Sequence, residues 1–395
     1  MNGAVLVASR PFDLSDAPFD AFVERHHRFV DLLTEHFTVS LLGLRPPGDT
    51  SHFAKRWSGL SSLEVTIGGA RQSRRHRAID ALAVGRNGTL ADWEVELASV
   101  AASLEPDAVV TLGPWLHREY RALHALRPSV HLFEEDLTRM HELAPQSPQA
   151  RALRTLQVRL EARSRRQPAA VGYISRREEA AARQRYPRAK AVYLPYTLDP
   201  VMWPLAGSPS QGTGAVAVGN MSEFRNAEGL AQLMALVAGK PEHPLWGTRV
   251  VSDKGLHPSL QPFVSTGQLM HAFGQDPATS YRQAAIAIVP ALRATGLKTT
   301  VLQAWTTGCP VVGFTACAES VRADATSMRF ADTAPELLDH IEQLFNQPAD
   351  RDALAYGGFA MLRDHYDDAR NQAAFLSVVR HAISTGDHVS ASTRV

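Results

Sequence analysis

Short apolar runs alternate with longer amphipathic segments along most of the chain, and this alternation limits the folds that it can adopt. The runs AVLVAS (4–9), DAVVTLG (107–113) and AAIAIVP (284–290) are almost continuously apolar. Such runs are typical of strands that are buried on both faces of a parallel sheet. Segments 89–105 and 226–238 have the length and periodicity of helices. The alternation predicts an α/β fold in which helices cover both faces of parallel, doubly wound sheets.

The alternation starts again after a segment rich in Pro, Gly and Ser, YTLDPVMWPLAGSPSQGTG (196–214). A chain of 395 residues exceeds what one hydrophobic core normally serves. We therefore predict two Rossmann-like domains, 1–198 and 199–372. A closing helix over 373–388 is expected to pack back on the first domain, and residues 389–395 are expected to form a flexible tail.

Composition excludes several classes of protein. The 41 basic and 40 acidic residues leave a net charge of +1, so no global field attracts nucleic acid. The two cysteines, Cys309 and Cys317, lie in an apolar segment and are too few for a disulfide framework, which favours a reducing cytoplasm. No apolar run reaches the roughly eighteen residues of a membrane span, and the N-terminus lacks an export signal. We expect a cytoplasmic protein, with peripheral contact to the inner face of the membrane left open.

One loop and helix start, within ATGLKTTVLQAWTTG (294–308), has the chemistry of an anion site. In open α/β sheets ligands lie beyond the carboxyl ends of strands, where helix N-termini present free N–H groups. Gly296 allows close backbone approach, Lys298 supplies a charge, and Thr299 and Thr300 supply hydroxyl donors. Gln303 lies one turn further, within reach of a sugar hydroxyl. This predicts a phosphate-bearing ligand; a glycine turn with a threonine cap and a surface lysine is the alternative.

The segment AIAIVPALRATGLKTTVLQAWTTGCPVVGF (285–314) resembles the nucleotide-sugar site of group-one glycosyltransferases with the GT-B fold. Further pieces follow in the order of that family: YISRREEAAARQRYP, VYLPYTLDP, VGNMSEFRNAEGL and QLMHAFGQDPATSYRQAAIAIVP. The likeness spans about residues 130 to 320. It implies two Rossmann-like domains that face a cleft. It also implies an enzyme, a retaining transferase that moves a sugar from a nucleotide-diphosphate donor in the second domain to an acceptor in the first.

The resemblance also implies the residues of the site. Donor-binding roles fall on Gly219, Asn220, Arg225, Phe273, Gly274, Gln275, Thr295, Gly296, Leu297, Lys298, Thr299 and Gln303. Catalytic roles fall on Glu135, Lys298 and Arg225, and acceptor-binding roles on Trp115, His117 and Glu134. The bland alternatives are a solvated loop arginine at 225, a structural histidine at 117 and an acidic helix N-terminus at 134–136.

Two positions depart from the family pattern. The paired glutamates of the family correspond here to Thr295 and Gln303, so neither is a carboxylate. A glutamine can still accept a hydrogen bond from a ribose hydroxyl, but without the strength of a charged acceptor. Lys298 matches the basic position of one branch of the family. Two further functions therefore stay open beside the transferase: a non-catalytic GT-B protein that binds a nucleotide sugar or a partner, and a nucleotide-sugar epimerase.

Motifs for metal or other chemistry are missing from the sequence. There is no HExxH, no cysteine pairing of zinc spacing and no DxD pair at a strand end, so we predict no metal and no cofactor. The G-x-S-x-G elbow of hydrolases is also missing. The expected partners are a nucleotide sugar, UDP- or GDP-linked, and a glycan, lipid-linked or small-molecule acceptor. The basic stretch RQSRRHR (71–77) is a solvated loop or a contact for anionic lipid or acceptor.

Overall fold

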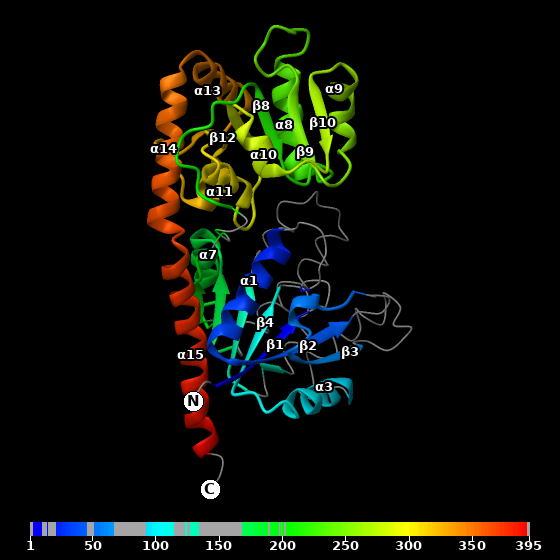
Figure 1. Ribbon diagram of the computed structural model, residues 1–395, viewed down its shortest axis with the longest axis vertical. Coiled ribbons are helices and arrows are strands. Elements are labelled where there is room, and N and C mark those ends of the chain that lie inside the picture. Colours follow the sequence, from blue (N-terminus) through cyan, green and yellow to red (C-terminus); the bar gives the residue numbers. More distant parts are fainter. Residues whose placement is uncertain are drawn as a thin grey trace. The chain divides into compact units, whose positions relative to one another are not determined.

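The fold is that of a computed structural model of the 395-residue chain. The structure describes residues 3–9, 14, 21–45, 51–66, 92–113, 123–124, 127–133, 168–188, 190–196, 198, 200 and 203–392. The chain divides into two compact units, which we call unit 1 (Met1–Tyr196 with Ala369–Val395) and unit 2 (Thr197–Asp368). Each unit is built on its own parallel sheet (Figure 1).

Unit 1 contains, in its described part, a parallel sheet in the order β3-β2-β1-β4-β5-β6-β7. Its strands are β1 (Ala4–Ser9), β2 (Thr38–Arg45), β3 (Ser61–Thr66), β4 (Ala108–Leu112), β5 (Ser129–Phe133), β6 (Ala170–Tyr173) and β7 (Ala191–Tyr193). Its described helices are α1 (Ala21–His36), η2 (Lys55–Trp57), α3 (Asp92–Ala102), α7 (Arg176–Arg185) and α15 (Asp368–Ser392). The chain order reverses between β1 and β4, which pair directly with each other.

Strand β1 shows why this sheet is covered on both faces. Its side chains alternate between two cores, because successive residues of a strand point to opposite faces. Val5 and Val7 join a cluster with residues of α1 and α15, whereas Leu6 and Ala8 join a cluster with residues of α3. A strand buried on both faces must be apolar at every position, which accounts for the continuous run AVLVA.

The last helix, α15, packs on the core of unit 1. Phe375, Leu376 and Val379 are buried at helical spacing, and the Phe375 ring lies 4.5 Å, centroid to centroid, from the ring of Phe29 in α1. The helix begins at Asp368, and Figure 1 shows it in red along this unit. It continues to Ser392, through part of the segment that the sequence predicted as a flexible tail. No described helix is both long and apolar enough to cross a membrane.

Unit 2 contains a parallel sheet in the order β10-β9-β8-β11-β12-β13. Its strands are β8 (Ala215–Val218), β9 (Thr248–Ser252), β10 (Leu269–Phe273), β11 (Ile286–Val289), β12 (Val311–Phe314) and β13 (Arg329–Ala331). Its helices are α8 (Phe224–Leu236), η3 (Pro258–Leu260), α9 (Gln261–Ser265), α10 (Pro277–Arg282), α11 (Thr299–Thr306), α12 (Thr315–Val321), α13 (Ala334–Asn346) and α14 (Pro348–His365). Two parallel sheets with helices between the strands confirm the predicted α/β class.

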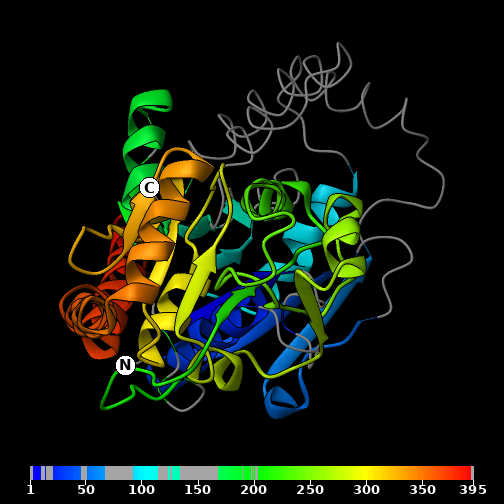
Figure 2. The ribbon, with the colours of Figure 1, turned by 90° about the horizontal axis from the view of Figure 1, so that it is seen from above.

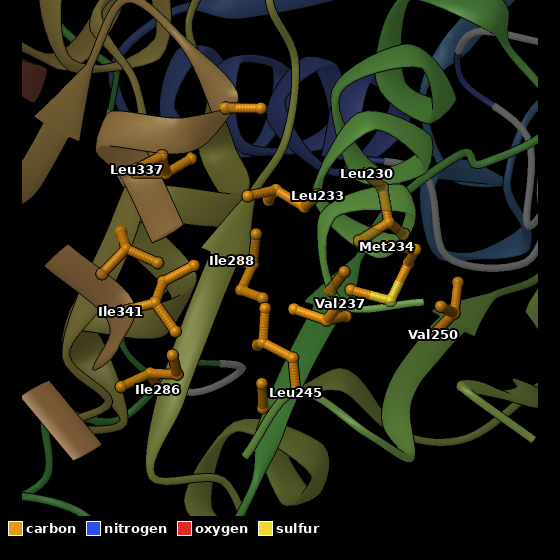
Figure 3. Close-up of a cluster of buried hydrophobic side chains, with 14 of the residues drawn as sticks. Leu230, Leu233, Met234, Val237, Leu245, Val250, Ile286, Ile288, Leu337 and Ile341 are labelled. Carbon is orange, nitrogen blue, oxygen red and sulfur yellow. The ribbon is translucent and has the colours of Figure 1, made fainter. Parts of the chain in front are cut away.

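Helices α8 and α13 cover one face of this sheet. Figure 3 shows Ile286 and Ile288 of β11 between Leu233 of α8 and Ile341 of α13, all fully buried. Each such side chain contributes about 1.5–3 kcal/mol of burial free energy relative to an exposed position. Helix α13 also contacts β12 and β13, and in Figure 2 this orange helix runs beside the yellow strands. The helices α10 and α11 contact the sheet at β8, β11 and β12.

The chain order of the second sheet reverses between β8 and β11. These two strands are neighbours, with Ile286 opposite Ala215 and Ala287 opposite Val216. Strands β9 and β10 lie on one side of β8, and β12 and β13 lie beyond β11. Because the strands are parallel, the loops that follow β8 and β11 leave the same edge of the sheet. Open α/β sheets bind ligands at such a reversal, so these two loops define the candidate site.

Candidate functional site

Two glycines shape the loops at the reversal. Gly219, directly after β8, has a φ of 137°, and Gly296, before α11, has a φ of 63°. Residues with a side chain rarely adopt either conformation. A Cβ atom at Gly219 would lie 3.8 Å from the Cγ2 atom of Thr300, so the loop after β8 passes next to the first turn of α11. The predicted start of this helix near 297–299 is confirmed, because α11 begins at Thr299.

Arg225, in the first turn of α8, joins the two loops. Its Nη1 atom donates a hydrogen bond to the Thr295 hydroxyl oxygen at 3.0 Å, and its Nη2 atom donates to the Glu223 carboxylate at 3.0 Å. Thr295 is 4% exposed, whereas 26% of the Arg225 side chain is exposed. One face of the guanidinium is therefore anchored in the protein, and solvent or a ligand can reach the rest.

The loop after β8 has its own hydrogen-bond network. The Asn220 side-chain amide donates to the second oxygen of Glu223, Oε1, at 3.2 Å. The Asn220 carbonyl oxygen of the side chain accepts from the backbone N–H of Ser222 at 3.2 Å. The Asn226 side chain donates to the Asn220 backbone carbonyl at 3.0 Å. The loop conformation is thus fixed before any ligand arrives, which is the condition for preorganised binding.

The loop before α11 is fastened to α12 at both of its ends. At its start, the Cys317 thiol donates a hydrogen bond to the Ala291 carbonyl at 3.1 Å. At its end, the backbone N–H of Lys298 donates to the Ser320 hydroxyl oxygen at 3.2 Å. Burial raises the pKa of the Cys317 thiol to about 11, although the Lys298 charge acts in the opposite direction. The thiol therefore stays protonated at neutral pH and serves as a structural donor.

Lys298 is the N-cap residue of α11, and its side chain is half-buried. The N-terminus of a helix carries partial positive charge from its free N–H groups. Lys298 brings a full positive charge to the residue that directly precedes this helix. Together with Arg225 across the reversal, this edge of the sheet has two cations at the places where the sequence predicted a phosphate-bearing ligand.

Gln303 and the segment Phe273–Gln275 are placed differently. Gln303 lies in α11 and is 3% exposed; among the described residues its side-chain amide has no hydrogen-bond partner. Phe273 ends the edge strand β10 and is 68% exposed, and Gly274 follows with a φ of 66°. This turn leads into α10, which Asp276 caps through the backbone N–H groups of Ala278 and Thr279. It shares the carboxyl edge with Arg225 but has no described hydrogen bond to it.

The predicted acceptor side lies outside the described residues. This applies to Trp115, His117, Glu134 and Glu135, and also to the basic stretch 71–77. Within the described part of the chain, no group of three or more His, Cys, Asp or Glu side chains is arranged to hold a metal ion. The candidate site therefore consists of the predicted donor-binding residues of unit 2.

Sequence reasoning missed two residues that the structure adds to this site. Glu223 contacts Arg225, and its acidic type beside a predicted phosphate-binding arginine was a usable signal. The Ser320 hydroxyl accepts a hydrogen bond from the backbone N–H of Lys298. No sequence signal indicated this role, because Ser320 belongs to α12, beyond the next strand.

Residues 213–347 match the model of the family Glycosyl transferases group 1. The chain carries a group 1 glycosyltransferase domain. This match confirms the predicted resemblance and the prediction of an enzyme of the glycosyltransferase class. The matched segment contains every predicted donor-binding residue, from Gly219 to Gln303. A search of curated proteins found no sequence match.

Solved structures of glycosyltransferases share the fold of this chain. Sucrose-phosphate synthase from Thermosynechococcus elongatus superposes with a TM-score of 0.73 at 13% identity, covering 97% of this chain and 100% of the other. For trehalose 6-phosphate synthase from Burkholderia multivorans the TM-score is 0.67 at 14% identity, covering 98% and 100%. For Anabaena HepE in complex with UDP and glucose the TM-score is 0.65 at 12% identity, covering 96% of this chain and 100% of the other. The GT-B fold is thereby confirmed.

Proposed function

We propose that this protein transfers a sugar from a nucleotide-diphosphate donor, and that the donor phosphates lie against the loops 219–223 and 290–298 of unit 2. One observation carries the proposal. Arg225 is tied to Thr295 across the strand reversal, beside the Lys298 cap of α11, inside the matched family domain. Two cationic residues and a helix N-terminus along one edge of a parallel sheet suit a diphosphate better than a neutral ligand.

The chemistry follows from where charge develops. As the bond between the sugar and the diphosphate breaks, negative charge grows on the leaving phosphate oxygens. Lys298, Arg225 and the first-turn N–H groups of α11 are already in place, so they stabilise that charge without rearrangement. Thr299 adds a hydroxyl donor at the same turn. These groups supply the positive charge that a metal ion supplies in other enzymes, and we infer a metal-independent transfer that needs no cofactor.

The rest of the donor and the acceptor complete the proposal. We assign the ribose to the Gln303 amide and the nucleobase to the turn at Phe273–Gln275, beyond the edge strand β10. The acceptor, a glycan, a lipid-linked glycan or a small molecule, is assigned to unit 1 with Trp115, His117, Glu134 and Glu135. Retention of anomeric configuration is part of the proposal. UDP is the first nucleotide to test, because the structure of HepE contains UDP and glucose.

Thermal denaturation of the full chain in the presence of UDP, GDP and their sugars tests the donor site. A ligand that binds only the folded state raises Tm by mass action. At a ligand concentration one hundred times Kd, the free energy of unfolding increases by about 2.7 kcal/mol. We expect a shift with one nucleotide and its sugar, and the same shift with EDTA present. If no nucleotide diphosphate moves Tm, the proposal is overturned.

Turnover then separates the transferase from the two other functions. Slow release of free sugar from the donor, followed by NMR of its anomeric proton, supports a retaining transferase when the first product is the α anomer of an α-linked donor. Interconversion of two nucleotide sugars indicates an epimerase. The two replaced glutamates, Thr295 and Gln303, favour the remaining function, a binding protein without activity, which predicts a Tm shift and no turnover.

A further inference from the structure

Glu223 occupies the N-cap position of α8 but does not cap the helix. Its side chain accepts no hydrogen bond from the N–H groups of that helix. Its two carboxylate oxygens accept instead from the side chains of Asn220, at 3.2 Å, and Arg225, at 3.0 Å. A carboxylate near a helix N-terminus is stabilised by the partial positive charge of the free N–H groups there. Here the carboxylate is instead paired with Arg225, the cation that the proposed function assigns to the diphosphate.

The two partners of Arg225 differ in how easily they can be replaced. Thr295 is neutral and 4% exposed, so its hydroxyl stays where the loop holds it. Glu223 is 46% exposed, and its carboxylate can turn into solvent. An exposed ion pair contributes only about 0–1 kcal/mol, so a ligand of higher charge can displace it. A diphosphate offers several oxygens and more negative charge than one carboxylate, and arginine binds phosphate through two parallel hydrogen bonds.

We propose that Glu223 is a built-in competitor for the donor diphosphate: it occupies the anion position on Arg225 in the empty site, and Thr295 keeps the guanidinium in place when the diphosphate displaces it. The inference rests on the proposed function and names residues that tune it. Glu223 weakens the hold on any diphosphate, including the nucleotide product, and so favours its release. Thr295, a positioning residue, strengthens that hold.

The two residues therefore predict opposite effects on binding. Glu223→Gln keeps an oxygen acceptor near Arg225 and removes the negative charge, so the site gains one net positive charge. Thr295→Val keeps the size of the side chain and removes the hydroxyl acceptor, so the guanidinium loses its fixed position. A general loss of structure at this edge of the sheet weakens binding in both variants, whereas the proposal requires binding to strengthen in the first.

Titration calorimetry of the full chain with UDP, and separately with inorganic pyrophosphate, measures these effects. We expect Glu223→Gln to bind both probes about 3- to 10-fold more tightly at low salt, and the gain to shrink at about 0.5 M NaCl, where screening acts within a few ångströms. The matched control is Glu342→Gln. Glu342 is 48% exposed and pairs with His243 at 3.0 Å elsewhere in unit 2, and its variant is expected to leave both affinities unchanged.

Thr295→Val is expected to weaken the binding of both probes about 3- to 10-fold. Thr295→Ser is expected to restore their affinity, because serine keeps the hydroxyl. Thr248→Val is the control and is expected to leave both affinities unchanged. Thr248 is equally buried, at 1% exposed, but it lies at the amino end of β9, away from the carboxyl edge that carries the site. Far-UV circular dichroism shows that each variant is folded. If the wild type binds neither probe, the proposed function falls and this inference with it. If the wild type binds but Glu223→Gln binds equally or more weakly, the inference alone is overturned.

Discussion

The backbone N–H of Lys298 donates a hydrogen bond to the Ser320 hydroxyl oxygen at 3.2 Å, so a residue of α12 sets the position at which α11 begins. Ser320 is 4% exposed, and its hydroxyl in turn donates to the Cys317 carbonyl at 2.7 Å. The proposed phosphate site is therefore supported by α12, the helix that follows the next strand, β12. Orientation of the Lys298 turn does not depend on its own loop alone.

Ser320→Ala tests this support. The substitution leaves the Lys298 N–H without its partner at a half-buried place, which costs about 1–3 kcal/mol. We expect a lower midpoint of urea unfolding and a higher KM for the nucleotide sugar, because the first turn of α11 loses one constraint. Ser265→Ala is the control: its hydroxyl donates to the Gln261 carbonyl on an exposed helix, and we expect a change within about 0.5 kcal/mol. Equal effects of the two variants contradict the assigned role.

Lys298→Ala tests the charge at the same turn. Removal of one preorganised cation from the leaving-group site should lower kcat by about 10²- to 10³-fold. The measurement is the release of free sugar from the donor under saturation. Lys240→Ala is the control, because Lys240 is an exposed lysine of the same unit before β9, at the opposite edge of the sheet. A kcat that falls less than threefold in Lys298→Ala would place the leaving diphosphate elsewhere.

Gly219→Ala tests the backbone conformation next to that turn. The φ of 137° is strained for any residue with a Cβ atom, which costs about 1–3 kcal/mol. We expect a lower free energy of unfolding in urea and weaker binding of UDP, since the loop shifts relative to Thr300. Gly255→Ala is the control, because Gly255 has no atom within 4 Å of a built Cβ and no positive φ. An unchanged stability of Gly219→Ala means that the loop relaxes at little cost.

The fold could be predicted from the sequence further than the site could. The alternation of apolar runs and helical segments is a local property, so it predicted both sheets, and the glycine turn before Thr299 predicted the start of α11. The contacts of Glu223 and Ser320 could not be predicted in the same way. Glu223 contacts Arg225 instead of capping its own helix, and Arg225 is in turn bonded to Thr295, which lies 70 residues further along the chain. The last helix begins at Asp368, earlier than the residue 373 that periodicity indicated, and it runs to Ser392.

Cys309 and Cys317 predict how stability changes at alkaline pH. Burial raises the pKa of Cys309 to about 12 and that of Cys317 to about 11, from 9.0. The folded state thus holds these protons more tightly than the unfolded state. The stability from each thiol is fully present below pH 9 and is lost as pH rises through the folded pKa, by at most about 1.4 kcal/mol per unit for each group. We expect the free energy of urea unfolding, measured with a reductant, to fall between pH 9 and 11.

Cys317→Ala identifies the contribution of one thiol. The variant lacks the group that releases a proton on unfolding, so its stability should fall less steeply with pH than that of the wild type. The comparison is between slopes, and the constant loss from the missing thiol contact with Ala291 does not affect it. Parallel slopes for the variant and the wild type between pH 9 and 11 would show that Cys317 is accessible and ionises normally in the folded protein.

Phe375→Ala tests the attachment of the last helix to unit 1. Its ring is 1% exposed and lies against Phe29, so its removal opens a cavity in the core that joins α1 and α15. Loss of a buried phenylalanine costs about 3–5 kcal/mol. We expect a lower urea midpoint for the unfolding of unit 1. Near-UV circular dichroism monitors this transition, because the aromatic cluster lies in unit 1. Arg380→Ala on the same helix is the control, since Arg380 is exposed and its removal leaves that core intact. If both variants unfold at the wild-type midpoint, α15 does not stabilise unit 1.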